Sequence, residues 1–251
     1  MDEHALLAFA RRHEVAVVQL GDNLPVHQFS DDRLSTFIAQ AHHAGVLVEL
    51  GARGLTDAHL QRYLHLCAAC RCRLLRFVVD QGSYAPPVRD LRALLRNAAP
   101  ALEAAGVTLA IENHDRFPAR VLRTLVDELG SPHVGICLDT ANSLGAGEGL
   151  EFVADLLAPV TVNLHVKDVT IARLPHQMGF TIEGRPLGEG MLPIQKAIDR
   201  VSRGGRCESA ILEAWTSPAG DLDATIRAEA TSAARGIETL KRWVRVVQCQ
   251  V

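Results

Sequence analysis

The sequence predicts an α/β fold, more specifically a (β/α)8 TIM barrel, and two observations lead to this expectation. Short runs rich in Val, Ile and Leu alternate with amphipathic helical stretches along the chain, a pattern typical of parallel strands that are buried on both faces. The chain has 251 residues, which is a common length for one closed barrel. We therefore expect a single barrel domain over residues 1–251 rather than a doubly wound sheet.

The expected elements follow one another in a regular order. Apolar runs such as VAVVQL and VGICLD predict strands at 15–20, 46–50, 73–79, 107–112, 134–139, 160–166 and 209–214. Helical patterns predict helices at 2–12, 30–45, 55–70, from 87 onward, 119–129, 148–158, 193–203 and 222–246. Ser30 and Thr56 are expected N-caps, and Pro87 stands in a first turn. Residues 167–192 are expected to form a long loop.

The pattern contains seven strands and begins with a helix, so the first strand of an eight-stranded barrel is missing from it. Two explanations follow. Either the seven strands correspond to strands two to eight of the barrel, or the chain is a truncated or non-catalytic binding relative. An open barrel has exposed sheet edges, which makes a homo-oligomer an expected assembly.

Composition excludes several classes of partner. The net charge is −3 with a pI near 6.4, and no Lys/Arg-rich run is present, so a nucleic-acid partner is not expected. No apolar run reaches the roughly 18 residues of a membrane span, and the N-terminus does not resemble a signal peptide. We therefore expect a cytoplasmic protein, in which the cysteines, including the CAACRC group, are mostly small buried core residues.

The last four expected strands end in ionisable residues. Glu112, Asp139, His165 and Glu213 are each the first ionisable residue after an apolar run, in LAIE, GICLD, VNLH and AILE. In a parallel barrel the carboxyl ends of the strands surround one mouth. Three carboxylates there would repel one another without a cation, and oxygen ligands with one imidazole suit manganese, magnesium, cobalt or zinc. The sequence therefore predicts one divalent metal ion at the barrel mouth.

The segments IENHD, CLDTAN, LHVKD, GEG and ILEAW resemble the xylose isomerase-like, AP endonuclease-like barrel superfamily, in its sugar isomerase and epimerase branch. The resemblance covers roughly residues 100–216. It implies that Glu112, Asp139, His165 and Glu213 hold the metal, and that Glu112 and Glu213 are also catalytic proton shuttles. The implied reaction is isomerisation or epimerisation of a small sugar or sugar acid through a metal-bound enediolate.

Two residues depart from the epimerase pattern. Asn142 replaces a histidine often found there, and Pro118 stands where some epimerases have a glutamate. The segment HVKDVTIARLPHQMGFTIEGRPLGEG is also similar to decarboxylases of this superfamily that act on 3-oxo sugar acids such as 3-oxo-isoapionate. A metal-dependent decarboxylase is therefore the alternative reaction. A nuclease is disfavoured, since it would need further metal ligands and a basic surface.

Several polar residues near the expected mouth are candidates for substrate binding. The charged groups of the long loop could bind an anionic substrate, while its glycines at 184, 188 and 190 suggest tight turns or a closing lid. Glu49, Asp80 and the segment 21–23 are also expected at the mouth. The candidates for substrate binding are His114, Asn142, Lys167, Arg173, His176 and Glu189.

Overall fold

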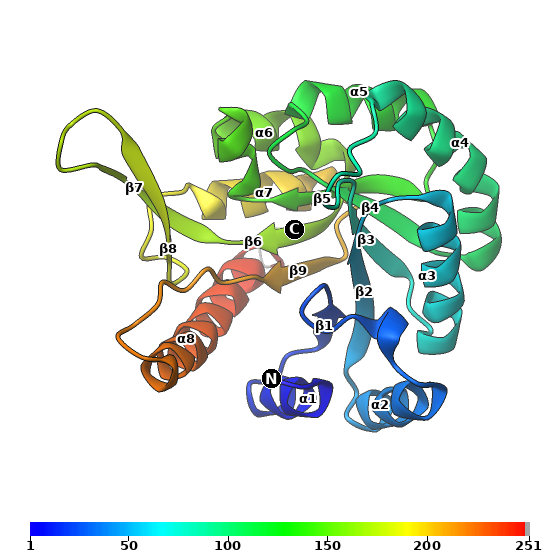
Figure 1. Ribbon diagram of the computed structural model, residues 1–251, viewed down its shortest axis with the longest axis horizontal. Coiled ribbons are helices and arrows are strands. Elements are labelled where there is room, and N and C mark those ends of the chain that lie inside the picture. The colour runs from blue at the N-terminus through cyan, green and yellow to red at the C-terminus, as the bar shows by residue number, and fades with distance from the viewer. Residues whose placement is uncertain (249–251) are drawn as a thin grey trace.

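The protein folds as a nearly closed barrel of seven parallel strands with helices on the outside (Figure 1). The computed structural model describes residues 1–248, with side chains up to Val244. The strands pair in the order β1 (Val17–Leu20), β2 (Leu47–Arg53), β3 (Leu74–Val78), β4 (Thr108–Glu112), β5 (Val134–Asp139), β6 (Thr161–Val166) and β9 (Ser209–Leu212). The end strands β1 and β9 lie in contact but share no ladder in the described part of the chain. The α/β barrel with seven strands is confirmed.

The helices lie close to where the sequence predicts them. They are α1 (Glu3–Arg12), α2 (Asp31–His43), α3 (Asp57–Cys70), α4 (Val88–Ala105), α5 (Ala119–Leu129), α6 (Leu150–Leu157), α7 (Ile194–Gly204) and α8 (Leu222–Gln248). Short 3-10 turns are η1 (Val26–Gln28), η2 (Asn142–Ala146) and η3 (Ala158–Val160). Ser30 and Thr56 accept hydrogen bonds from backbone N–H groups in the first turns of α2 and α3. These N-caps explain why both helix starts could be predicted.

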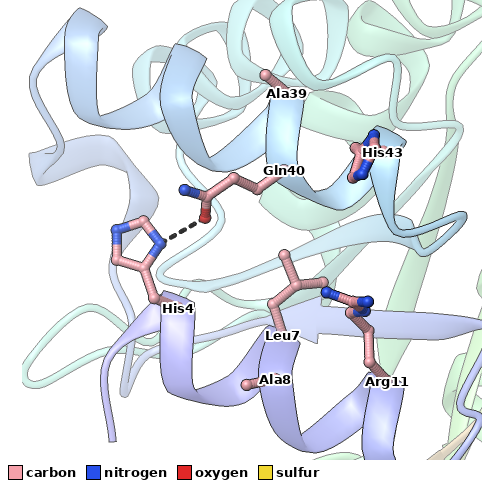
Figure 2. A pocket seen from close by; sticks show the side chains of 7 residues that line it. All are labelled: His4, Leu7, Ala8, Arg11, Ala39, Gln40 and His43. Carbon is pink, nitrogen blue, oxygen red and sulfur yellow. Dashed lines mark hydrogen bonds between the residues drawn. The ribbon is translucent and has the colours of Figure 1, made fainter.

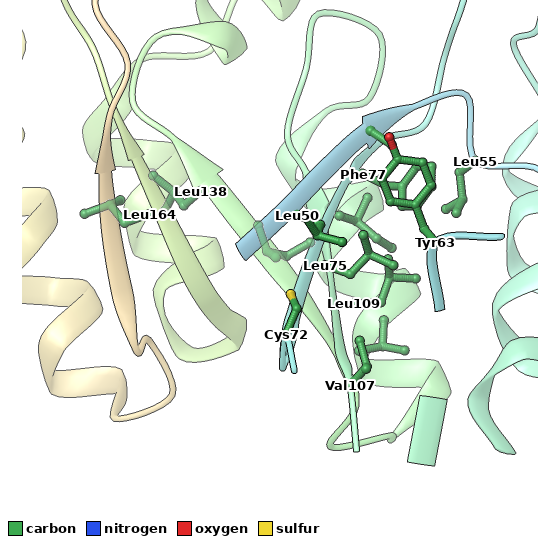
Figure 3. Close-up of a cluster of buried hydrophobic side chains, with 14 of the residues drawn as sticks. Leu50, Leu55, Tyr63, Cys72, Leu75, Phe77, Val107, Leu109, Leu138 and Leu164 are labelled. Carbon is green, nitrogen blue, oxygen red and sulfur yellow. The ribbon is translucent and has the colours of Figure 1, made fainter. Parts of the chain in front are cut away.

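The main core lies between the strands and the helices around them. Figure 3 shows Leu50, Leu75 and Leu109 from three neighbouring strands packed near Tyr63 of α3. Side chains alternate along a strand, so residues on either side of these leucines point into the barrel instead. Each fully buried leucine contributes about 1.5–3 kcal/mol of transfer free energy. This outer core fixes the strand register, and the register decides which polar residues meet inside the barrel.

The structure corrects the prediction of a long loop at 167–192. This segment contains an antiparallel hairpin, β7 (Asp168–Arg173) and β8 (Phe180–Arg185), which projects from the barrel (Figure 1). The short runs VTIA and FTIE are rich in β-branched and aromatic residues, which favour strands. They lie among Gly, Pro and charged residues, and for that reason the pattern is typical of a loop.

The root of the hairpin is held by one buried carboxylate. Asp168 accepts hydrogen bonds from the backbone N–H groups of Val169, Gly188 and Gly190 at 2.9, 2.9 and 3.0 Å. A Cβ atom at Gly190 would lie 2.0 Å from Asp168 Oδ1, and one at Gly184 would lie 1.9 Å from a backbone oxygen. The two glycines therefore permit close packing against Asp168 and Trp215. The hydrogen bonds to Asp168 anchor the base of the hairpin.

Two further predictions can be compared with the structure. No helix within residues 1–248 is both long and apolar enough to cross a membrane. Four of the cysteines are buried, as expected, namely Cys67, Cys70, Cys72 and Cys137, whereas Cys207 is only partly buried. Cys249 lies outside the described residues.

Candidate metal centre

Four side chains converge at the carboxyl ends of four neighbouring strands. Glu112 and Asp139 end β4 and β5, His165 is the penultimate residue of β6, and Glu213 directly follows β9. One ligand atom from each of these residues lies within 4.8 Å of the others. Glu112, Asp139 and His165 are buried, and Glu213 is partly exposed. We call these residues the four-ligand group; the sequence predicts the same four.

Each member of the four-ligand group has one atom without a hydrogen-bond partner in the described structure. These atoms are Glu112 Oε2, Asp139 Oδ2, His165 Nδ1 and Glu213 Oε2. The three oxygens lie within 3.2 Å of the cationic nitrogens of Lys167 or Arg76, and a cation at the centre of the group would contact all four atoms. Three carboxylate oxygens and one imidazole nitrogen suit Mg²⁺, Mn²⁺, Co²⁺ or Zn²⁺. The donor set therefore fits a divalent cation.

The second oxygen of each buried carboxylate is already engaged. Glu112 Oε1 accepts a hydrogen bond from the Asn142 side-chain amide at 2.7 Å. Asp139 Oδ1 accepts from the backbone N–H groups of Ala141 and Asn142, both at 2.8 Å. These bonds prevent the carboxylates from rotating, because each is held by one oxygen. As a result, Glu112 Oε2 and Asp139 Oδ2 face the same point.

Two buried cations accompany the carboxylates. Lys167 Nζ lies 2.8 Å from Asp139 Oδ2 and 2.6 Å from Glu213 Oε2. Arg76 Nε lies 3.2 Å from Glu112 Oε2, and the Arg76 residue is only 5% exposed. In the described structure the ammonium group of Lys167 therefore supplies positive charge to two of the oxygens that a metal would bind.

The charges in the site determine its pKa values. Burial by itself would lower the pKa of Lys167, but the carboxylates of Asp139, Glu213 and Glu112 raise it above its usual value. Burial would likewise raise the pKa of Glu213, but the adjacent His165 ring and the Lys167 ammonium hold it well below its usual range. Lys167 is therefore protonated and Glu213 ionised near neutral pH.

Two of the predicted substrate-binding residues lie with the four-ligand group, and a third lies near the barrel mouth. Asn142 and Lys167 are both buried, and Lys167 Nζ is 3.3 Å from Asn142 Oδ1. The ring of Trp215 lies over the same ammonium, at 5.1 Å. His114 follows β4 and lies between Arg53 at 3.4 Å and Asp115 at 3.2 Å. The structure thus brings Asn142 and Lys167 together with the predicted metal ligands.

The other three candidates have different surroundings. Arg173 donates a hydrogen bond to the Gln177 carbonyl and stacks on Phe180 within the hairpin. His176 is exposed at the tip, where its Nδ1 accepts from a backbone N–H group. Glu189 forms an ion pair with Arg235 of α8. The structure does not bring these three residues together with the four-ligand group.

The prediction that Glu49 lies at the mouth is wrong. Strand β2 continues to Arg53 instead of ending near Leu50, which leaves Glu49 inside the barrel with an exposed fraction of 8%. Burial raises its pKa. Asp80 is partly exposed and pairs with Arg116, 2.7 Å away. The additional strand residues 51–53 were hard to predict, because their sequence GAR has low strand propensity.

Sequence reasoning missed two residues that contact the four-ligand group. Arg76 in the middle of β3 reaches Glu112, and Gln19 in β1 lies 2.8 Å from His165 Nε2 through its Oε1 atom. The available signal was a polar residue flanked by apolar ones in a strand with two buried faces, as in LLRFV and VVQL. Such a residue needs a buried polar partner.

Cys137, Glu112 and His165 form a second cluster of side chains of the kinds that bind metals. Burial raises the pKa of this thiol well above its usual value, and its Sγ donates a hydrogen bond to Asn163 Oδ1 at 3.2 Å. A metal-binding cysteine must be a thiolate. The four-ligand group therefore fits a cation better than the group with Cys137.

A surface groove of about 360 Å³ lies between α1 and α2 (Figure 2). Its lining includes Leu7 and Arg11, and across it His4 Nδ1 is 2.7 Å from Gln40 Oε1. None of the residues that line it belongs to the four-ligand group. The groove is therefore separate from the candidate metal centre.

The fold and the four-ligand group define a barrel of the xylose isomerase-like class. The family model described as "Xylose isomerase-like TIM barrel" matches residues 10–243. The chain therefore belongs to this family. It is 32% identical over 225 residues to a 3-oxo-isoapionate decarboxylase from Pectobacterium atrosepticum, an alignment that covers 90% of this chain and 82% of that protein.

Solved structures show the same fold. A D-psicose 3-epimerase from Clostridium cellulolyticum, solved with D-tagatose, has a TM-score of 0.75 at 14% identity, covering 97% of this chain and 94% of that one. A xylose isomerase-like TIM barrel protein from Mycobacterium smegmatis, solved with magnesium, has a TM-score of 0.74 at 13% identity, covering 98% and 90%. At these identities the likeness shows the fold alone.

Proposed function

We propose that the protein is a divalent-metal-dependent decarboxylase of a 3-oxo sugar acid. The sequence patterns favour an isomerase or epimerase, and the structure supplies a reason to reverse this order. Glu112 Oε1 accepts a hydrogen bond from Asn142, and Oε2 lies 3.2 Å from Arg76 Nε beside the metal position. These contacts restrict Glu112 as a proton shuttle, whereas an epimerase needs two opposed proton-handling groups.

Decarboxylation requires only one proton donor. The bond between the carboxyl carbon and C2 breaks, carbon dioxide leaves, and the electron pair forms an enolate with the 3-oxo group. A divalent cation bound by the four-ligand group would supply Lewis acidity for that oxygen. C2 then accepts one proton. The protonated Lys167, 2.6 Å from Glu213, is the group we assign to deliver it. The similarity to the Pectobacterium decarboxylase supports the same reaction.

Isomerisation or epimerisation of a sugar is the second candidate. Glu112 and Glu213 both direct an oxygen toward the centre of the four-ligand group, as two opposed proton shuttles would. In this reaction a proton leaves one carbon, and the same or a neighbouring carbon regains one. The arrangement of Glu112 with Arg76 opposes this use, because the buried guanidinium holds Glu112 Oε2 in an ion pair at 3.2 Å.

The two reactions are separated by one assay on the manganese-loaded protein. We expect carbon dioxide release from 3-oxo-isoapionate, measured by a coupled carboxylation assay, and no change in D-psicose or D-tagatose, measured by chromatography. Lys167→Met should remove carbon dioxide release. Lys196→Met should retain it, because Lys196 of α7 forms an exposed pair with Glu151 of α6. Epimerised sugar without carbon dioxide release would establish the second candidate. Bound metal without either reaction would leave a non-catalytic binding protein.

A further inference from the structure

A chain of buried and partly buried polar side chains runs from β2 through β1 to the predicted metal ligand His165. Gln19 Oε1 lies 2.8 Å from His165 Nε2. On its other side, the Gln19 amide nitrogen donates to Glu49 Oε2 at 3.0 Å. Gln19 and Glu49 are direct neighbours in the β1–β2 register, so the backbone pairing keeps the two side chains together.

The surroundings of Gln19 allow only one orientation of its amide. The Oε1 end faces the fixed donor Arg76 Nε at 3.4 Å, next to His165 Nε2. The Nε2 end faces two acceptors, Glu49 Oε2 and, at 3.2 Å, Asn163 Oδ1. A flipped amide would direct its NH₂ group at a guanidinium and its oxygen at a carboxylate. Both contacts would be repulsive, so the flipped form is excluded.

This orientation decides which nitrogen of His165 holds the proton. Because Gln19 presents an acceptor, Nε2 must carry a hydrogen. The lone pair of neutral imidazole then lies on Nδ1, the atom that faces Glu112 and Glu213 at 3.7 and 3.5 Å and has no hydrogen-bond partner in the described structure. A metal binds a histidine through its unprotonated nitrogen. The tautomer set by Gln19 is therefore the one that a metal at this position requires.

We propose that Gln19, oriented by Glu49, is a positioning residue that fixes the Nε2–H tautomer and ring orientation of His165 for metal binding. The inference rests on the metal centre of the proposed function but not on the reaction. Asn163 extends the chain: its Nδ2 donates to Glu49 at 3.4 Å and to Ser209 Oγ at 2.8 Å. The network thus links β1, β2, β6 and β9 across the seam where β1 and β9 lack a ladder.

The test uses zinc alone, with no substrate. Calorimetry gives the zinc affinity, and proton–nitrogen correlation spectra of ¹⁵N-histidine-labelled protein show which ring nitrogen binds zinc. We expect His165 of the wild-type protein to bind through Nδ1 and to keep a slowly exchanging proton on Nε2. Gln19→Met keeps the length of the side chain but removes the acceptor. It should weaken zinc binding about 10–100-fold, the usual effect of losing a partner behind a metal ligand, and make the Nε2 proton exchange faster.

A double variant and a control separate this role from a structural one. The double variant Gln19→Glu with Glu49→Gln exchanges the amide and the carboxylate between β1 and β2. Residue 19 still offers His165 an acceptor oxygen. The double variant should recover most of the zinc affinity that Gln19→Met loses. Val18→Ala, at a buried neighbour in β1 outside the network, should lower the melting temperature without changing zinc affinity or the bound nitrogen.

Different failures have different meanings. Gln19→Met protein that binds zinc as tightly as wild type, with the same Nε2 proton, overturns this inference and leaves the proposed function intact. Zinc bound through Nε2 in the wild-type protein also overturns it. If wild-type protein binds zinc through Nδ1 but releases no carbon dioxide with manganese, the inference stands and the proposed reaction fails. Wild-type protein that binds neither metal overturns both.

Discussion

Arg76 provides the most direct test of the electrostatics of the site. Its guanidinium is buried and lies 3.2 Å from Glu112 Oε2. Arg76→Met keeps much of the volume but removes the charge, and it leaves the Glu112 carboxylate in the barrel without this cation. Removing one partner of a buried ion pair destabilises a protein by about 3–5 kcal/mol. For a domain of this size each kcal/mol corresponds to about 2–4 °C, so we expect the melting temperature to fall by about 6–20 °C.

The assay is thermal unfolding in metal-free buffer and again with manganese. Arg76 Nε and a metal would both lie beside Glu112 Oε2, so the variant should be stabilised by manganese more than the wild-type protein is. Adding Glu112→Gln to the variant removes the unpaired charge and should recover part of the lost stability in metal-free buffer. Both effects depend on the charge of Glu112 and not on side-chain volume.

The control is Lys196→Met. Lys196 pairs with Glu151 at 3.1 Å, and both side chains are more than half exposed, so the ion pair contributes only about 0–1 kcal/mol. Its loss should therefore change the melting temperature by no more than a few degrees. The reasoning is refuted if Arg76→Met unfolds within about 2 °C of the wild-type protein in metal-free buffer, since that shift corresponds to about 1 kcal/mol or less.

Three further predictions concern the metal, the hairpin and pH. Glu213→Ala should reduce bound manganese, measured by mass spectrometry, from about one equivalent per chain to almost none. Gly184→Ala places a Cβ 1.9 Å from a facing backbone oxygen and should cost about 1–3 kcal/mol in thermal unfolding, whereas Gly149→Ala meets no atom within 4 Å and should not. Arg33 lowers the pKa of Glu3 from 4.5 to about 2. A carboxyl group whose pKa is lower in the folded state stabilises the fold above the pKa of the unfolded state, and this stability is lost as the pH falls through the folded pKa. Glu3→Gln should therefore be only about 1 kcal/mol less stable than wild type at pH 7, because Arg33 is half exposed and solvent screens the pair, and equally stable near pH 2 in urea titrations.

The residues of the four-ligand group could be predicted because each one interrupts an apolar run at its end. A charge at that position is visible in LAIE or GICLD without any knowledge of strand pairing. Parallel strands then bring the ends together, since every strand of a barrel terminates at the same mouth. The helix starts at Ser30 and Thr56 could be predicted for a similar reason, because an N-cap is a local signal.

The contacts behind the ligands could not be predicted in the same way. Arg76 and Glu112 meet because β3 and β4 pair with Phe77 opposite Ile111, and a shift by one residue would turn Arg76 to the other face of the sheet. Gln19 reaches His165 across 146 positions of sequence. The hairpin at 168–185 was missed because its two short strands stabilise each other only once paired, and no single run reveals this.

The charges gathered at the barrel mouth also bear on the choice of substrate. The three carboxylates of the four-ligand group carry three negative charges, and the two buried cations Arg76 and Lys167 leave the site one unit negative. A divalent cation would make it one unit positive. A neutral ketose gains little from that charge, whereas the carboxylate of a 3-oxo acid matches it, and in a buried site such a match is worth more than in water. Once carbon dioxide has left, the product is neutral and this attraction is lost. Under the proposed function, this charge would favour binding of a sugar acid and release of its decarboxylated product, which a neutral pair of epimers would not require.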